Sequence, residues 1–198
     1  LSIGGSESAG YYMARALNAL GHRVTVFTNA DKPSRSGSVY YMPLSMFRQY
    51  CEYTPQDVMI VQRSPELLTF PHCAKFTAMW CHDLALGRAE GNFKGVMWNT
   101  DKVFVLSKYM YDQYKEVYNL PNDKELLFIT RNGVDIATVE SSRARLMDKA
   151  AKEGSPIVDI ARDPYQLCFA ARPERGLDVM LGEIMPRVLA KEPEAHLA

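Results

Sequence analysis

The residues best suited to chemistry in this sequence are two arginines of the segment RPERG, Arg172 and Arg175. They lie three positions apart in a turn that we predict between a strand and a helix. A guanidinium group binds phosphate oxygens through paired hydrogen bonds, and a helix N-terminus adds partial positive charge. Such a pair could stabilise the charge on a departing diphosphate. The alternative interpretation is two solvated charges in an exposed turn, with Glu174 between them facing solvent.

A second candidate is the segment GGSE near the start of the sequence. Gly4 and Gly5 allow a ligand to approach the backbone closely, and the helix that we expect behind them offers free N–H groups. We expect Ser6 to cap this helix and Glu7 to favour its positive end. The spacing is not G-x-G-x-x-G, so a dinucleotide fingerprint is not indicated. The alternative is an ordinary tight turn.

His82 follows an apolar strand at its carboxyl end, where ligands of open α/β sheets bind. Asp83 has two interpretations, either orienting His82 or capping the next segment. The adjacent pairs His72-Cys73 and Cys81-His82 suggest zinc ligands. Adjacent residues of a strand point to opposite faces, however, so no metal site is predicted.

Alternating short strands and helices must position these residues. Apolar, β-branched segments predict strands, and spacings of three and four predict helices. The strands are expected at 23–29, 57–62, 75–81, 101–107, 125–130 and 165–171, and the helices at 7–20, 107–120, 140–152 and after 176. The first helix should bury Ala9, Tyr12, Met13, Ala16, Leu17 and Leu20, and the second Met110, Tyr114, Val117 and Tyr118. Such alternation predicts an α/β fold, with helices on both faces of a Rossmann-like parallel sheet.

Details of the chain predict where these elements begin, end and bend. Ser107 should cap its helix, Gly21 should end the first helix, and Pro186 should kink or break the last. Asn132 and Gly133 suit a turn with positive φ and mark a hinge. We predict one domain over 1–136, a connecting segment over 137–163, and the start of a second Rossmann-like domain over 164–198, represented by its first strand and helix.

Composition excludes several classes of function. The 198 residues carry 23 basic and 23 acidic side chains, so no basic excess favours nucleic acid as a partner. No apolar run is long enough for a transmembrane segment. The four cysteines form no C-x-x-C pair, which is typical of a reducing, cytoplasmic protein.

The order of segments GGSE, GHRVTVFT, CHD, DKVFVLSKY, NGVD and ARPERGLDVML resembles the retaining nucleotide-sugar glycosyltransferases of family 4. That family has the GT-B architecture of two Rossmann-like domains. The resemblance is weak over 30–56 and 137–163. In the family a strand precedes the glycine loop, and an acidic pair lies farther along the second domain. The resemblance therefore implies an internal fragment that lacks both and is inactive by itself.

The resemblance also implies roles for the candidate residues. His82 would contact the transferred sugar, and Gly4, Gly5, Arg172 and Arg175 would bind the nucleotide-sugar donor. Family members usually have lysine at the position of Arg175. The acceptor would be a sugar, a glycan or a lipid-linked glycan, and neither a cofactor nor a metal ion is expected. Asp83, Asn132 and Gly133 would have auxiliary roles.

Two other functions stay open. A Rossmann-type oxidoreductase would need a dinucleotide fingerprint, although Asp31 does follow a predicted strand. A non-catalytic, flavodoxin-like binding module would need a complete first strand with an acidic cluster.

Overall fold

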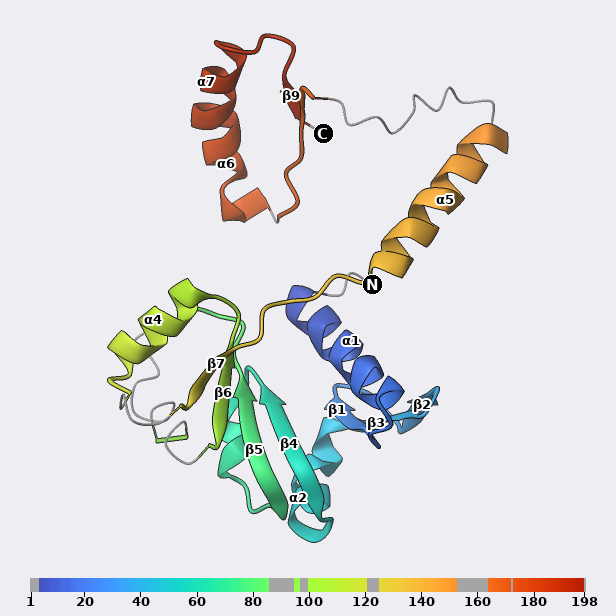
Figure 1. Cartoon of the computed structure of the whole chain (residues 1–198), viewed down its shortest axis with the longest axis vertical. Helices are drawn as coiled ribbons and strands as arrows, with labels where there is room; N and C mark the ends of the chain where they lie inside the picture. Colours follow the sequence, from blue (N-terminus) through green and yellow to red (C-terminus); the bar gives the residue numbers. More distant parts are fainter. Residues whose placement is uncertain are drawn as a thin grey trace. The chain divides into compact units, whose positions relative to one another are not determined.

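A computed structural model describes residues 4–85, 95–96, 100–120, 125–152, 164–171 and 173–197. The chain divides into two compact units, Leu1–Val134 and Asp135–Ala198 (Figure 1). Among the described helices, none has the length and apolar character needed to cross a bilayer.

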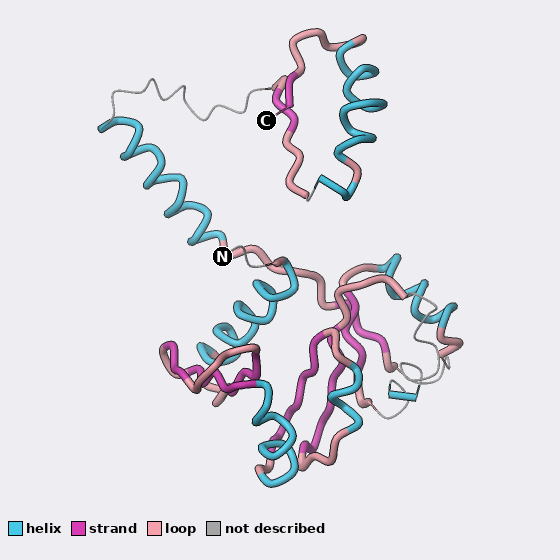
Figure 2. Tube along the Cα trace, turned by 180° about the vertical axis from the view of Figure 1, so that it is seen from behind, coloured by secondary structure: helices cyan, strands magenta, loops and turns pink. Residues whose placement is uncertain are grey.

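The centre of the first unit is a parallel sheet of four strands (Figure 2). Its strands, in spatial order, are β4 (Gln56–Gln62), β5 (Ala74–Trp80), β6 (Lys102–Val105) and β7 (Leu127–Ile129). They confirm the four predicted strands between residues 57 and 130, although β6 and β7 are shorter than expected. The carboxyl ends of all four strands lie at one edge of the sheet, because every pairing is parallel.

The core of this unit lies on one face of the sheet. Alternate strand residues meet α2 (Phe47–Tyr53) and α4 (Lys108–Val117) there. The buried members of this cluster are Phe47, Cys51, Met59, Val61, Met79, Cys81, Ala85, Val103, Val105, Met110, Tyr114, Tyr118, Leu120 and Leu126. The predicted cap of α4 is confirmed, since Ser107 Oγ accepts a hydrogen bond from Met110 N at 3.1 Å. The prediction that Val117 is buried is wrong, because it lies 37% exposed at the end of α4.

Helix α1 (Gly5–Ala19) lies beside the carboxyl end of β4, where Gly10 faces the side chain of Gln62, and it also contacts β3 (Val39–Pro43). A parallel sheet flanked by helices confirms the predicted α/β, Rossmann-like fold class. The predicted buried face of α1 is wrong in part: Leu20 is 76% exposed and Tyr12 is 39% exposed, whereas Ala14 is buried. Ala16, also predicted to be buried, is exposed, whereas Met13 and Leu17 are half-buried. Gly21 ends the helix with φ 93°, as predicted.

A separate sheet of three strands completes the first unit. It consists of β1 (Thr25–Thr28), β3 (Val39–Pro43) and β2 (Ser34–Ser36), with β1 parallel to β3 and β2 antiparallel to it. The short helix η1 (Leu44–Met46) then leads into α2. The prediction that β1 is buried on both faces is wrong, because its residues are half-buried or exposed. Phe27 nevertheless packs on Phe47 and so joins this sheet to the core. The remaining helix of the unit is η2 (Pro65–Thr69).

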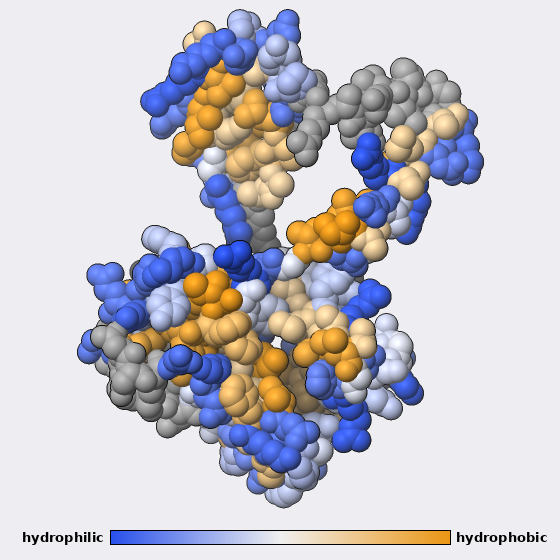
Figure 3. Space-filling view, viewed as in Figure 1, coloured by the Kyte–Doolittle hydropathy of each residue, from blue (hydrophilic) through white to orange (hydrophobic). Residues whose placement is uncertain are grey.

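The second unit contains one long helix and a small α/β element. Helix α5 (Ile136–Lys152) begins four residues before the predicted position, because Asp135 caps it by accepting from Thr138 N at 3.1 Å. Apolar residues lie along α5 among polar ones on the surface (Figure 3), and Ile136 and Leu146 are each 61% exposed.

In the α/β element, β8 (Gln166–Leu167) pairs in parallel with β9 (His196–Leu197), so the strand predicted over 165–171 is only two residues long. Between them lie η4 (Pro173–Arg175), α6 (Leu177–Val179), the π-helical η5 (Met180–Ile184) and α7 (Met185–Leu189). The predicted irregularity near Pro186 is confirmed as the π-helical turn directly before α7, whose first turn contains this proline.

Candidate functional site

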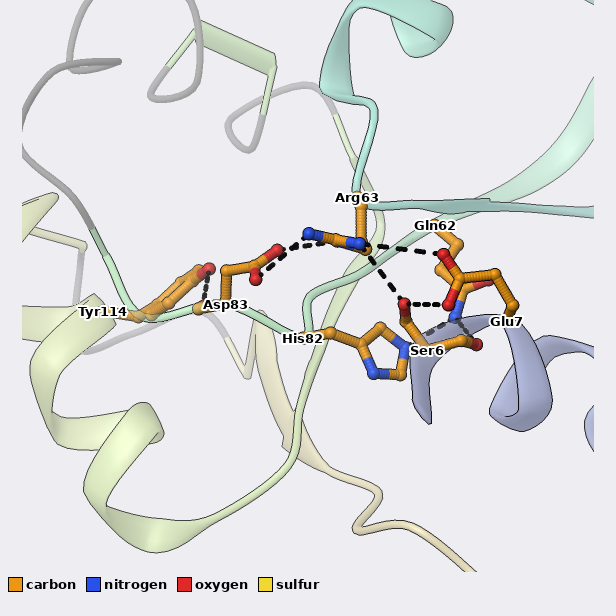
Figure 4. A network of polar contacts seen from close by, with 7 residues as sticks. All are labelled: Ser6, Glu7, Gln62, Arg63, His82, Asp83 and Tyr114. Carbon is orange, nitrogen blue, oxygen red and sulfur yellow. Dashed lines mark hydrogen bonds and ion pairs between the residues drawn. The ribbon is translucent and has the colours of Figure 1, made fainter. Parts of the chain in front are cut away.

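Polar side chains gather at the carboxyl edge of the four-stranded sheet. Gln62 is the last residue of β4, His82 follows β5 by two residues, and α1 begins beside them (Figure 4). Open parallel sheets bind their ligands at this edge. The fold therefore brings the predicted His82 and the glycine segment to one place.

Gln62 joins these two segments through its side-chain amide. Its Nε2 lies 2.7 Å from Ser6 O, in the first turn of α1, and 2.7 Å from His82 Nε2 (Figure 4). A Cβ atom at Gly10 would lie only 2.8 Å from Gln62 Oε1. The missing side chain at Gly10 therefore leaves the room that this amide occupies.

Arg63 forms the second half of the site. Its guanidinium contacts both carboxylate oxygens of Asp83, at 2.7 Å from Nε and 3.2 Å from Nη2, and donates to Ser6 Oγ at 3.3 Å. Glu7 Oε1 lies 4.0 Å from Nη1 on the other side. Arg63 has φ 64°, a left-handed conformation that is uncommon for a residue other than glycine. Strained residues of this kind cluster at functional sites.

The pKa values of His82 and Glu7 are both lowered, which favours a neutral histidine and an ionised glutamate. Burial lowers the pKa of His82, and Arg63 lowers it further, whereas Asp83 and Glu7 act in the opposite direction. Hydrogen bonds from its own backbone N–H and from Ser6 lower the pKa of Glu7, with a contribution from the charge of Arg63. The site thus holds two carboxylates, one guanidinium and an imidazole that resists protonation.

These side chains line an open pocket of about 410 Å³. Its lining consists of Ser6, Glu7, Gln62, Arg63, Ser64 and Asp83. This volume is within the usual range for small-molecule sites, but the lining is more polar than in most of them. Hydroxyl, carboxylate, amide and guanidinium groups together suit a ligand rich in hydroxyl groups.

The two predicted glycines, Gly4 and Gly5, differ in how much room a side chain would have at each position. Gly4 is the N-cap of α1, in place of the predicted Ser6, whose hydroxyl instead donates to Glu7 Oε2 at 2.9 Å. A Cβ atom at Gly4 would lie 2.4 Å from that same oxygen, so any other residue at this position would push the Glu7 carboxylate aside. A Cβ atom at Gly5 would meet nothing within 4 Å.

Three auxiliary predictions have different outcomes. The carboxylate of Asp83 binds Arg63, and no contact with the ring of His82 occurs among the described residues; the segment that Asp83 was predicted to cap lies largely outside them. The positive φ expected at Asn132 and Gly133 is wrong: it occurs at Arg131, with φ 60°, and both predicted residues have ordinary backbone angles. Their role as a hinge stays a prediction.

The two arginines predicted to bind the donor belong to the second unit. Arg172 lies outside the described residues. Arg175 is exposed at the end of η4, and Gly176 follows it with φ 104°. Donor binding by this pair stays a prediction.

Sequence analysis missed Gln62, Arg63 and Glu7 as site residues. The predicted strand 57–62 did place Gln62 at its carboxyl end and Arg63 directly after it, at the same edge as His82, but nothing in the sequence indicated the contacts that these two side chains make. The described residues contain no cluster of three or more His, Cys, Asp or Glu with the arrangement of a metal site. Cys81 is buried in the core, whereas His82 contacts Gln62, so these neighbours do point apart.

Trp80 supports His82 from β5. The two ring centroids are 4.7 Å apart, and Trp80 is only 4% exposed. A buried aromatic face of this kind fixes the ring of His82 and shields it from water. In the described part of the chain, the indole N–H of Trp80 has no hydrogen-bond partner.

Neither a protein family model nor a curated protein matches this sequence.

Proposed function

We propose that this chain belongs to an enzyme that transfers a sugar from a nucleotide-diphosphate donor to an acceptor, with retention of configuration. The supporting observation is the Gln62 amide, which joins the first turn of α1 to His82 at the ligand-binding edge of the sheet. N–H groups of a helix N-terminus attract negatively charged oxygens, and an imidazole can hydrogen-bond a sugar hydroxyl. The order of the sequence motifs adds the resemblance to family 4.

In this proposal the polar pocket receives the acceptor. Glu7 is a hydrogen-bond acceptor for hydroxyl groups, because its lowered pKa keeps it ionised near neutral pH. Ser6 and Ser64 can donate or accept. His82 contacts the transferred sugar at the same edge. These groups position the acceptor hydroxyl for attack.

Bond making and bond breaking take place on one face of the donor sugar. The bond between the sugar carbon and the diphosphate oxygen breaks, and a bond to the acceptor oxygen forms. The departing diphosphate takes the acceptor proton, so no protein nucleophile is needed. Arg172 and Arg175 stabilise the charge of the leaving group. The enzyme acts in the cytoplasm, where a reducing environment suits its free cysteines.

The test is an NMR titration of the isotope-labelled chain with UDP-sugars and GDP-sugars, and separately with NADH. Binding requires no turnover, so the readout does not depend on catalysis by the chain. We expect saturable shifts of the His82 ring and of the Gly5 amide with one donor. His22, beyond the other end of α1, is the internal reference and should not shift.

A matched pair of variants tests the role of the arginines. Arg175→Ala should weaken binding of the nucleoside diphosphate by roughly tenfold to a hundredfold, because a hydrogen bond to a charged group contributes about 1.5–3 kcal/mol. Arg175→Lys should weaken it less. The proposal is refuted if no nucleotide sugar shifts His82 or Gly5. Shifts with NADH alone would favour the oxidoreductase.

A further inference from the structure

The side chain of Gln62 determines which nitrogen of His82 carries the proton. Ser6 O can only accept a hydrogen bond, so the atom of Gln62 that lies 2.7 Å from it must be the amide nitrogen. The reversed amide would place two oxygens in contact. The same nitrogen lies 2.7 Å from His82 Nε2, and an amide nitrogen donates but does not accept. His82 Nε2 must therefore be the unprotonated acceptor.

We infer that Gln62 is a positioning residue that holds His82 as the neutral imidazole protonated at Nδ1. The ring then offers an N–H donor at Nδ1, and its one basic nitrogen is occupied by Gln62. Toward a ligand, His82 acts as a hydrogen-bond donor and not as a general base. The use of that donor on a sugar oxygen depends on the proposed function, whereas the tautomer itself does not.

The surroundings of the ring favour this neutral form. Protonation would place an N–H of the imidazolium against the N–H of Gln62, so the contact would have to break. Arg63 and burial against Trp80 oppose the positive charge, while Asp83 and Glu7 favour it. The two carboxylates are themselves engaged, Asp83 by Arg63 and Glu7 by Ser6. Burial and the Gln62 contact therefore act in the same direction.

The experiment is a long-range ¹H–¹⁵N NMR spectrum of the histidine rings in the full chain without ligand, recorded over a pH series. The His82 signal is assigned by its disappearance in His82→Gln. We expect a protonated Nδ1 and an unprotonated Nε2 at neutral and mildly alkaline pH. His22, which is exposed beyond the end of α1, serves as the internal comparison for an ordinary tautomer mixture.

The decisive variant is Gln62→Glu, in which the donor is replaced by an acceptor of the same shape. A carboxylate there should move the proton to Nε2 and shift the titration of His82 to higher pH. Gln49→Glu, the same change on the exposed surface of α2, should alter neither. The inference is overturned if unmodified His82 is protonated at Nε2 or averages between tautomers, and this result requires no variant to fold. It is also overturned if folded Gln62→Glu keeps the Nδ1 tautomer. Nucleotide-sugar binding is measured separately, so failure of the proposed function would leave these spectra unchanged.

Discussion

Alkaline pH should destabilise the folded chain through the buried thiol of Cys81. This side chain is 3% exposed within the core cluster, and burial raises its pKa from 9.0 to about 12. Between these two values the unfolded chain loses the thiol proton, whereas the folded chain keeps it. The unfolded state then binds fewer protons, so the free energy of unfolding falls as the pH rises.

The size of this effect follows from the two pKa values. At pH 10 the unfolded thiol is ionised by about ten to one, while the folded thiol remains protonated. The unfolded state is then stabilised by RT ln 11, which is about 1.4 kcal/mol. The contribution of Cys81 is fully present below pH 9 and declines toward pH 12.

The assay is urea unfolding of the parent chain and of Cys81→Ala at pH 7.5 and pH 10. Each protein is compared with itself at the two pH values, so the packing contacts of the sulfur that the variant loses cancel. The parent should lose about 1.4 kcal/mol more than Cys81→Ala between these conditions. Cys73→Ala, at an exposed cysteine, should behave like the parent. Equal losses in the parent and Cys81→Ala would refute the reasoning.

Three further predictions concern α4, α1 and the site. Ser107→Ala should lower the free energy of unfolding by about 1 kcal/mol in urea titrations, because the capping hydrogen bond of α4 is lost. Gly10→Ala should displace the side chain of Gln62 and shift the His82 ring in NMR spectra, whereas Gly5→Ala should leave the ring unchanged because its Cβ meets open space. Burial lowers the pKa of His82, so its contribution to stability is present above the ordinary histidine pKa and is lost as the pH falls. His82→Gln should therefore lose less stability than the parent between pH 7.5 and pH 5 in urea titrations.

The four-stranded sheet was predictable because its strands are short segments rich in apolar and β-branched residues, even though single residues such as Val58 and Phe128 are exposed. The three-stranded sheet was predicted only at β1. Strand β2 contains no apolar residue, and β3 alternates too briefly for a clear pattern. Their pairing is a tertiary property that the local sequence does not express.

The buried face of α1 was predicted from hydrophobicity alone, and this is why it was partly wrong. Tyr12 in α1 and Leu20 at its C-cap are large and exposed, yet the close approach to β4 is made at Gly10. A helix that packs tightly against a sheet buries small residues. A prediction that favours large apolar residues therefore assigns the buried face of α1 to the wrong side of the helix.

His82 was predicted from its place after a strand, but the residues that fix it were not. Gln62 binds an oxygen of the backbone at Ser6, and no pattern of residue types encodes such a contact. Arg63 was hidden for a different reason. Its side chain reaches Asp83 because the backbone at Arg63 is left-handed. This conformation cannot be predicted from the sequence when the residue is not glycine.

That backbone conformation explains how two consecutive residues serve one pocket. In an extended strand, neighbouring side chains point to opposite faces, so Gln62 and Arg63 would be separated by the sheet. The left-handed turn at Arg63 ends β4 and brings both side chains to the pocket. Such a conformation costs about 1–2 kcal/mol. The exposed ion pair with Asp83 contributes only about 0.2–1 kcal/mol, so it does not offset the strain by itself. The backbone bond from Arg63 N to Trp80 O, at 3.1 Å, also holds the turn in place. The contacts of Arg63 therefore leave part of this conformational cost uncompensated. We expect such a cost if the turn is retained because it places Arg63 beside Glu7 and Asp83.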